Sequence, residues 1–396
     1  MGDKEGISPH TIRNILIRDY VLSFLAFFVF LAAFNALVPT LPLYLARLGS
    51  SEREIGVLVG TIGIASLVSR LLVGKTLRKY PERPVMMGGA MLFALTFLAL
   101  VVFRPFWPFF VVRLLQGIAF ASLDTAAIAY AIRIVPEAYR ARGISYFLLA
   151  TSLASAVAAT SSVFVVNKYG FAVLLLACTG LSFCALLLSW KLKRQETAWP
   201  VVTSPVKNTL FFEPKILAPA MVSFLFFSSW AGLAAFFPLY SVKCGVTNPG
   251  IFFSAAAVMI IAVRVLGGRA FEIYSREKII PAFIFVSMVA LVILSFSSTL
   301  PMFILVGLLM GAALAFLIPV TMAYALEYAG SSDGRAVGTY QTSMDLGLAL
   351  GPVTMGIIVP LTGYRVMFLC LALTCLINLG YFQFYLRKKC GVAHTV

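Results

Sequence analysis

Charged side chains are scarce in this sequence. They make up 12% of the 396 residues, whereas 61% of the residues are hydrophobic. Average soluble proteins carry roughly twice as much charge. So little charge excludes a soluble globular domain, and so many apolar residues exclude a disordered chain. The mean hydropathy of +0.97 predicts a polytopic membrane protein instead.

Cysteine and histidine are also few, and neither residue forms a cluster. The six cysteines include no C-x-x-C pair, and the two histidines, His10 and His394, lie near the ends of the chain. This pattern predicts no disulfide framework and no metal site, and it excludes a histidine proton relay inside the membrane. The sequence also lacks a P-loop and a nucleophile elbow, so we expect neither an enzyme nor a bound cofactor.

Long apolar runs are what the sequence has in abundance. A membrane-spanning helix needs about 20 mostly apolar residues, and twelve runs approach this length. Barrel strands would instead alternate over about ten residues. We therefore predict an all-α membrane protein with twelve transmembrane helices. The runs cover residues 20–45, 54–74, 85–103, 107–131, 144–166, 171–190, 216–242, 250–270, 280–298, 301–326, 337–359 and 364–386.

The distribution of basic residues predicts the orientation. A net charge of +16 would also suit a nucleic-acid-binding protein, but most of the 31 Lys and Arg residues lie in the two tails and in every second loop. The positive-inside rule therefore places both termini in the cytoplasm. We expect a multi-pass protein of the cytoplasmic (inner) membrane that meets anionic lipids, and not nucleic acid, at its cytoplasmic face. The other loops hold only Arg47, Arg53, Arg104, Lys168, Lys243 and Arg365.

The first and second halves of the chain resemble each other. Residues 109–131 align with residues 303–325 at an offset of 194, and eleven of these 23 positions are identical. The same offset aligns Arg70 with Arg264, each followed by glycine four residues later. Each half holds six spans, so the two repeats have the same topology in the membrane.

The repeat divides the chain into two bundles. We predict an N-terminal six-helix bundle at 1–190 and a C-terminal six-helix bundle at 216–396. Residues 191–215 contain three prolines and mixed charge, which is typical of a linker. Two parallel repeats are expected to be related by a pseudo-twofold axis along the membrane normal, with a substrate site between them.

Four short motifs resemble those of the major facilitator superfamily (MFS). The RLLQG segment at 113–117 is similar to its RxxxG motif in span 4, and residues 74–84 resemble its basic loop between spans 2 and 3. Residues 135–143 resemble its loop before span 5, and residues 344–352 resemble span 11 of bacterial efflux members. The resemblance covers nearly the whole chain and implies a small bacterial exporter of the drug–proton antiporter type, similar to arabinose-efflux permeases. It also implies alternating access, a proton gradient as the energy source and a monomer.

At two places the sequence departs from the family pattern. The aspartate of the loop between spans 2 and 3 is replaced by Arg78, and the GPxxG signature of span 5 is replaced at Ala156 and Val157. The counterpart of the loop in the second half does keep an acid, Glu272. These departures leave open a transporter that has lost or altered its coupling to protons.

Few charges lie within the predicted spans, and each is costly there, so each is a functional candidate. Arg113 and Asp124 are eleven residues apart in one span, which places them on nearly the same helix face. The resemblance puts that face at the central cavity. We predict that Asp124 and Asp345 carry protons and that Arg113 tunes Asp124 or binds an anionic group of the substrate. The alternative is a buried polar pair that fixes helix packing.

Several residues are candidates for gating. We propose from the family arrangement that Asp345 contacts Arg70 across the halves, and that Arg264 pairs with Glu327 within the second half. Gly347 and Gly351 follow Asp345 at a spacing that allows close helix packing. The resemblance further implies a latch in the basic loops, carried by Arg78 and Arg83 in the first half and by Glu272 in the second.

The expected cavity helices combine many aromatic side chains with few polar ones, which favours an amphiphilic substrate. The sequence thus predicts proton-coupled export of a small amphiphilic compound. Proton-coupled or uncoupled uptake of a small solute and flipping of an amphipathic lipid remain as alternatives. The substrate-binding candidates are Asn35, Gln116, Arg113, Asp124, Trp230 and Phe316.

Overall fold

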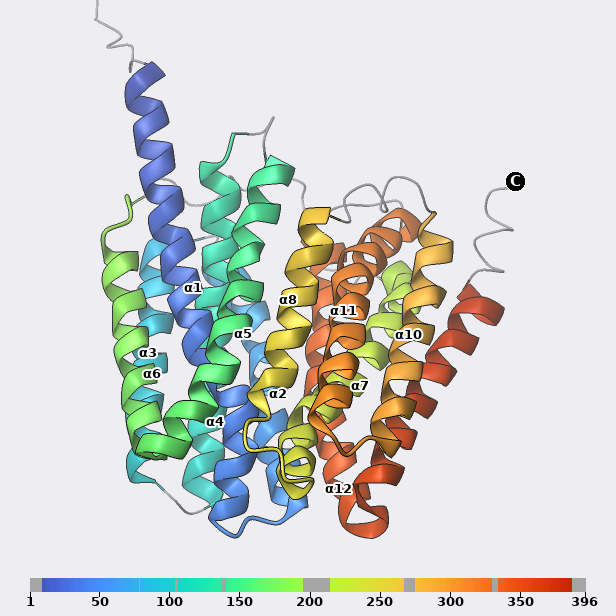
Figure 1. Cartoon of the computed structure of the whole chain (residues 1–396). Coiled ribbons are helices and arrows are strands. Elements are labelled where there is room, and N and C mark those ends of the chain that lie inside the picture. The colour runs from blue at the N-terminus through green and yellow to red at the C-terminus, as the bar shows by residue number, and fades with distance from the viewer. Residues whose placement is uncertain are drawn as a thin grey trace, which may run out of the picture.

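The computed structural model describes residues 9–77, 79–103, 106–136, 140–194, 214–266, 275–329 and 334–386. Every regular element in these ranges is a helix (Figure 1), so the predicted all-α class is confirmed. The helices are α1 (Pro9–Arg47), α2 (Glu52–Thr76), α3 (Glu82–Val102), α4 (Phe106–Ile134), α5 (Arg140–Tyr169), α6 (Phe171–Trp190), α7 (Pro214–Lys243), α8 (Gly250–Leu266), α10 (Arg276–Phe296), α11 (Leu300–Ala329), α12 (Gly334–Gly380) and the short π-helical η2 (Tyr381–Leu386).

Ten of the described helices are long and apolar enough to cross a membrane. The described part of α8 has 17 residues and is also apolar. The last two predicted spans lie in α12, which has non-helical backbone angles at Gly363, and the second of them continues into η2. Most of the predicted linker lies outside the described residues.

Two ends of the bundle can be defined from Figure 1. Helix α1 begins and η2 ends at the same end of the molecule, which we call the terminal end; we call the opposite end the far end. Turns at the far end contain glycine with a positive φ angle: Gly49 and Gly245 between the first and second spans of each half, and Gly170 and Gly363 between the fifth and sixth. Glycine is favoured in this left-handed conformation. The internal repeat is therefore visible in the turn geometry.

The start of α2 shows how a local sequence signal sets a helix boundary. The Ser51 hydroxyl accepts a hydrogen bond from the Glu54 amide, and the Glu54 carboxylate accepts one from the Ser51 amide at 2.8 Å. This capping box satisfies two amide groups that have no partner within the helix. It anchors the end of α2 from which the helix runs toward the terminal end.

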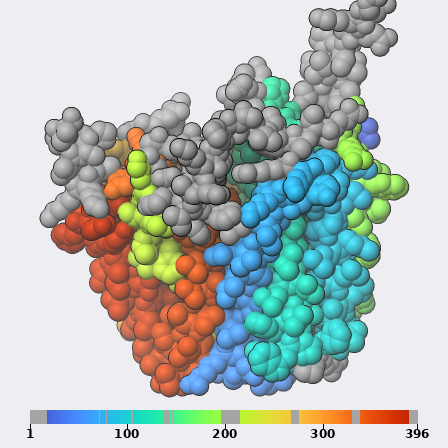
Figure 2. All heavy atoms as spheres, turned by 180° about the vertical axis from the view of Figure 1, so that it is seen from behind, coloured from blue at the N-terminus to red at the C-terminus, as the bar shows by residue number. Residues whose placement is uncertain are grey.

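The helices pack as two halves, α1–α6 and α7–η2, that meet along two seams. One seam joins α2 to α12 and the other joins α5 to α8, while α1 also contacts α7. Helix α8 is the second span of its half and α12 begins with the fifth, so the pseudo-twofold relation exchanges the two seams. Figure 1 shows the α5–α8 seam at the front, and Figure 2 shows blue atoms of α2 against orange atoms of α12 at the back.

Small residues allow the backbones to approach closely at both seams. A methyl group added to Gly60 of α2 would overlap the carbonyl oxygen of Ala349 in α12, and one added to Gly63 would lie 2.9 Å from the carbonyl oxygen of Asp345. At the other seam, a methyl group on Gly250 of α8 would overlap the carbonyl oxygen of Ala159 in α5. Close approach of this kind replaces the hydrophobic driving force that helices lack in lipid.

Candidate functional site

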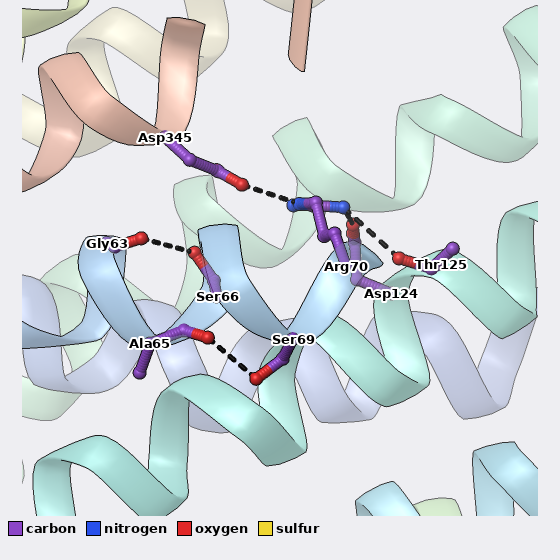
Figure 3. Close-up of polar contacts among 8 residues, drawn as sticks. All are labelled: Gly63, Ala65, Ser66, Ser69, Arg70, Asp124, Thr125 and Asp345. Carbon is purple, nitrogen blue, oxygen red and sulfur yellow. Dashed lines mark hydrogen bonds and ion pairs between the residues drawn. The ribbon is translucent and has the colours of Figure 1, made fainter. Parts of the chain in front are cut away.

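Arg70 lies at the centre of an ion cluster that joins both halves. Its Nε donates to Asp345 Oδ2 at 2.7 Å, and its Nη1 donates to Asp124 Oδ2, also at 2.7 Å. Figure 3 shows the guanidinium group of Arg70 between Asp345 on one side and Asp124 and Thr125 on the other. The contact that the sequence predicts between Arg70 and Asp345 is present, and Asp124 is an additional member.

The cluster is largely shielded from solvent but not sealed. The side chains of Arg70, Asp124 and Asp345 are 17%, 13% and 6% exposed. The loss of one member of a buried ion pair is costly, because the remaining charge is left without a partner in a low-dielectric environment. With both carboxylates ionised, the cluster carries one negative charge in excess. One proton, or one cationic group of a ligand, would therefore neutralise it.

Aromatic rings border the ion cluster. The guanidinium carbon of Arg70 lies 6.0 Å from the centroid of the Phe120 ring, within the range of a cation–π contact. The ring of Phe34 lies 4.5 Å from that of Phe120, and both rings are half-buried. Charged and aromatic groups side by side are the chemistry that an amphiphilic ligand requires.

Arg113 occupies a separate, buried position between α2 and α4. Its Nε donates to the carbonyl of Leu58 at 3.0 Å, and its Nη1 donates to Gln116 Oε1 at 2.7 Å. Arg113 and Asp124 both face α2, as their spacing indicates, but the cation that binds Asp124 is Arg70. The amide nitrogen of Gln116 is buried and has no partner among the described residues. The roles predicted for Arg113, Gln116 and Asp124 stay predictions.

The predicted pairing of Arg264 with Glu327 is wrong. Arg264 donates from Nη1 to the carbonyl oxygen of Leu148 at 2.9 Å, across the α5–α8 seam. Glu327 instead pairs with Arg276 at the start of α10. Arg264 of α8 and Glu327 of α11 therefore point to different neighbouring helices. The direction in which a side chain points depends on how its helix is rotated about its axis, and hydropathy does not reveal this rotation.

The other candidates have the following neighbours. Asn35 donates to the carbonyl of Leu31 in its own helix at 2.8 Å. Trp230 stacks on Phe252, and Phe316 stacks on Phe283 with ring centroids 4.1 Å apart. These residues remain candidates for substrate contact.

The gating candidates are spread over several interfaces. Gly347 and Gly351 pack against the backbone of α7, within the second half and not across the halves. Arg83 lies in the first turn of α3, beside Glu82, which pairs with Arg133. Arg78 and Glu272 lie outside the described residues.

Sequence reasoning missed the glycines that build the α2–α12 seam. Gly56, Gly60 and Gly63 all face α12, and their small-residue spacing was a usable signal. It also missed Asp19, a buried carboxylate near the start of α1 that accepts a hydrogen bond from Tyr130 at 3.2 Å.

Comparison with known proteins supports the fold and the family. The Major Facilitator Superfamily profile matches residues 23–282 and 245–391. The staphylopine export protein of Staphylococcus aureus is 23% identical over 371 residues, covering 89% of this chain and 91% of the relative. The multidrug resistance protein MdtG of Enterobacter lignolyticus is 22% identical and covers 95% of this chain and 94% of its own.

Solved structures show the same architecture. The nucleoside transporter NupG has a TM-score of 0.72 with 16% identity, covering 93% of this chain and 98% of its own. The human organic anion transporter MFSD10 has a TM-score of 0.67, also with 16% identity, covering 93% of this chain and 99% of its own. With two repeated helical halves, two exchanged seams and a profile that matches nearly its whole length, this chain belongs to the Major Facilitator Superfamily of membrane transporters.

Proposed function

We propose that this protein exports a small amphiphilic compound in exchange for protons by alternating access. The observation that carries the proposal is the Arg70 cluster, in which one cation holds carboxylates from both halves. The names of the sequence relatives, a staphylopine exporter and proteins of multidrug and quinolone resistance, favour export. The distribution of Lys and Arg favours a cytoplasmic position for the terminal end and for both termini.

The coupling step follows from the two bonds of Arg70. The bond to Asp345 crosses the α2–α12 seam, whereas the bond to Asp124 stays within the first half. Protonation of Asp345 neutralises the carboxylate that pairs with Arg70 across the seam and leaves Arg70 paired with Asp124. The two halves can then separate at the terminal end without stranding a charge. Loss of the proton restores the Arg70–Asp345 bond and closes this end again.

Substrate and proton are expected to act on this bond in opposite steps. A proton taken from the outer side opens the terminal end to the cytoplasm, where the proton leaves and the substrate enters. Closure by Arg70 and Asp345 then commits the substrate to release at the far end. Phe34 and Phe120, beside the cluster, supply apolar surface for the substrate. We expect a monomer to suffice, with anionic lipids at its cytoplasmic face.

Proton coupling can be tested in liposomes that contain the purified protein under an imposed pH gradient. We expect internal pH to change when a transported amphiphile is added, and we expect Asp345→Asn to reduce this proton flux to background. Asp124→Asn is expected to weaken the flux because Arg70 then turns wholly to Asp345. Glu327→Gln, which removes an exposed partner of Arg276, serves as the control.

Two results would contradict this proposal. Proton flux that persists in both Asp variants would mean that the cluster is not the coupling site. Substrate movement without any proton movement would identify an uncoupled carrier or a flippase. The likeness in fold to a nucleoside transporter keeps solute uptake as the second candidate; movement of substrate and protons in the same direction would support it.

A further inference from the structure

The two arginines that the internal repeat aligns have very different surroundings. Arg70 in the α2–α12 seam is held by two carboxylates. Arg264, its equivalent in the α5–α8 seam, contacts no carboxylate of the described residues, and its one hydrogen bond goes to the neutral carbonyl of Leu148. A guanidinium group has five N–H donors. Most of those on Arg264 therefore have no acceptor within the part of the chain that the structure describes.

The position of Arg264 on α8 makes these donors useful to a ligand. The side chain is half-buried, whereas Val258 and Val265 on the same helix are 56% and 68% exposed. At about 100° per residue, Arg264 lies roughly 100–120° around the helix from both valines. Exposed valines of a spanning helix face lipid, so Arg264 is turned from the lipid toward the contact between the halves.

The two seams carry opposite charge. They lie on opposite faces of the molecule, with α5 and α8 in front and α2 and α12 behind (Figures 1 and 2). The Arg70 cluster has one negative charge in excess, and Arg264 has one positive charge without a counterion among the described residues. Arg113 adds a further cation, but it is 4% exposed and bonded to α2 and Gln116. A ligand between the halves thus meets an acidic side and a basic side.

Resting on the proposed transport function, we propose that the substrate is zwitterionic, with its cationic group directed to Asp124 and Asp345 and its anionic group directed to Arg264. The cationic group would neutralise the excess negative charge of the Arg70 cluster, and the anionic group would neutralise the positive charge of Arg264. The planar fork of Arg264 suits a carboxylate or a phosphate, which it can bind with two parallel hydrogen bonds. The repeat supplies equivalent arginines, and the asymmetry arises because the described residues place carboxylates beside Arg70 and none beside Arg264.

A matched series of fluorescent compounds tests this assignment in the proteoliposomes described above. Dansyl-cadaverine carries an amine, dansyl-6-aminohexanoate carries a carboxylate, and Nε-dansyl-lysine carries both on nearly the same skeleton. Nε-dansyl-lysyl-glycine moves the carboxylate further from the amine. We expect at least one zwitterion to be transported about tenfold faster at low concentration than either singly charged compound, which corresponds to about 1.4 kcal/mol.

Variants of Arg264 distinguish binding by its planar guanidinium group from a general effect of its positive charge. Arg264→Gln is expected to remove the preference for zwitterions while leaving dansyl-cadaverine transport in place. Arg264→Lys is expected to keep part of the preference, because lysine retains the charge but not the fork. Lys168→Gln removes an exposed cation at the far end of α5 and is the matched control.

The possible outcomes distinguish this inference from the function on which it rests. Equal transport of the amine and the zwitterions, unchanged in Arg264→Gln, would overturn the zwitterion assignment and leave proton-coupled transport standing. No transport of any compound and no proton flux would count against the proposed function itself. An effect of Arg264→Gln that disappears in liposomes of phosphatidylcholine alone, which hold no lipid of net negative charge, would identify an anionic lipid headgroup as the partner of Arg264, and would also overturn the assignment.

Discussion

Replacing Arg70 with Gln is expected to abolish transport and to destabilise the protein strongly. The substitution leaves Asp124 and Asp345 without the cation that both now contact at 2.7 Å. Removing one partner of a buried ion pair typically costs about 3–5 kcal/mol, because the remaining charge stays in a low-dielectric environment. We expect a clear fall in the melting temperature of the purified protein in detergent and complete loss of substrate-dependent proton flux.

A rescue experiment separates the charge effect from loss of packing. The triple variant Arg70→Gln, Asp124→Asn, Asp345→Asn carries no stranded charge and should recover most of the lost stability, without recovering proton flux. Arg276→Gln breaks the exposed pair with Glu327 and a long hydrogen bond to the carbonyl oxygen of Ala323, and exposed pairs are worth at most about 1 kcal/mol. A triple variant no more stable than Arg70→Gln would show that the guanidinium acts by packing and not by charge.

Enlarging Gly60 is expected to slow the transport cycle while leaving the protein folded. A valine at this position would drive its Cβ into the carbonyl oxygen of Ala349, so the α2–α12 seam cannot close as it does here. Overpacking of this kind costs about 1–3 kcal/mol, enough to shift the balance between conformations by about fivefold to about 150-fold. We expect the transport rate to fall by a similar factor, with near-normal yield and gel-filtration behaviour.

Gly74 provides the matched control on the same helix. Apart from the backbone of α2 itself, no atom of the described residues lies within 4 Å of a methyl group added there, so Gly74→Val should transport at close to the normal rate. Gly60→Ala should be intermediate. If Gly60→Val transported as well as Gly74→Val, close approach of α2 and α12 would not be needed during transport.

Much of the architecture could be predicted from local sequence properties. The boundaries of α2 and α6 fall within a few residues of the predicted runs, because hydropathy and capping act over short distances. The repeat was visible because equivalent helices keep equivalent small residues. The contact between Arg70 and Asp345 could also be predicted, since the family arrangement places their helices side by side.

The partners of the remaining charges required the tertiary structure. The spacing of Arg113 and Asp124 correctly predicts a shared helix face, yet Arg70, on another helix, is what binds Asp124. Gly347 and Gly351 were expected in the gate between the halves and instead pack on α7. A glycine motif indicates that some helix comes close, but it does not indicate which one.

The sequence by itself determined that this chain is a helical membrane protein built from two parallel repeats, because apolar length and internal similarity are properties of the chain alone. Only the tertiary structure decided that Arg70 holds two acids while Arg264 contacts a backbone carbonyl. That difference depends on how each helix is rotated and shifted against its neighbour. Rotation and shift are set by the packing of all the helices together, and short-range sequence patterns carry little information about them.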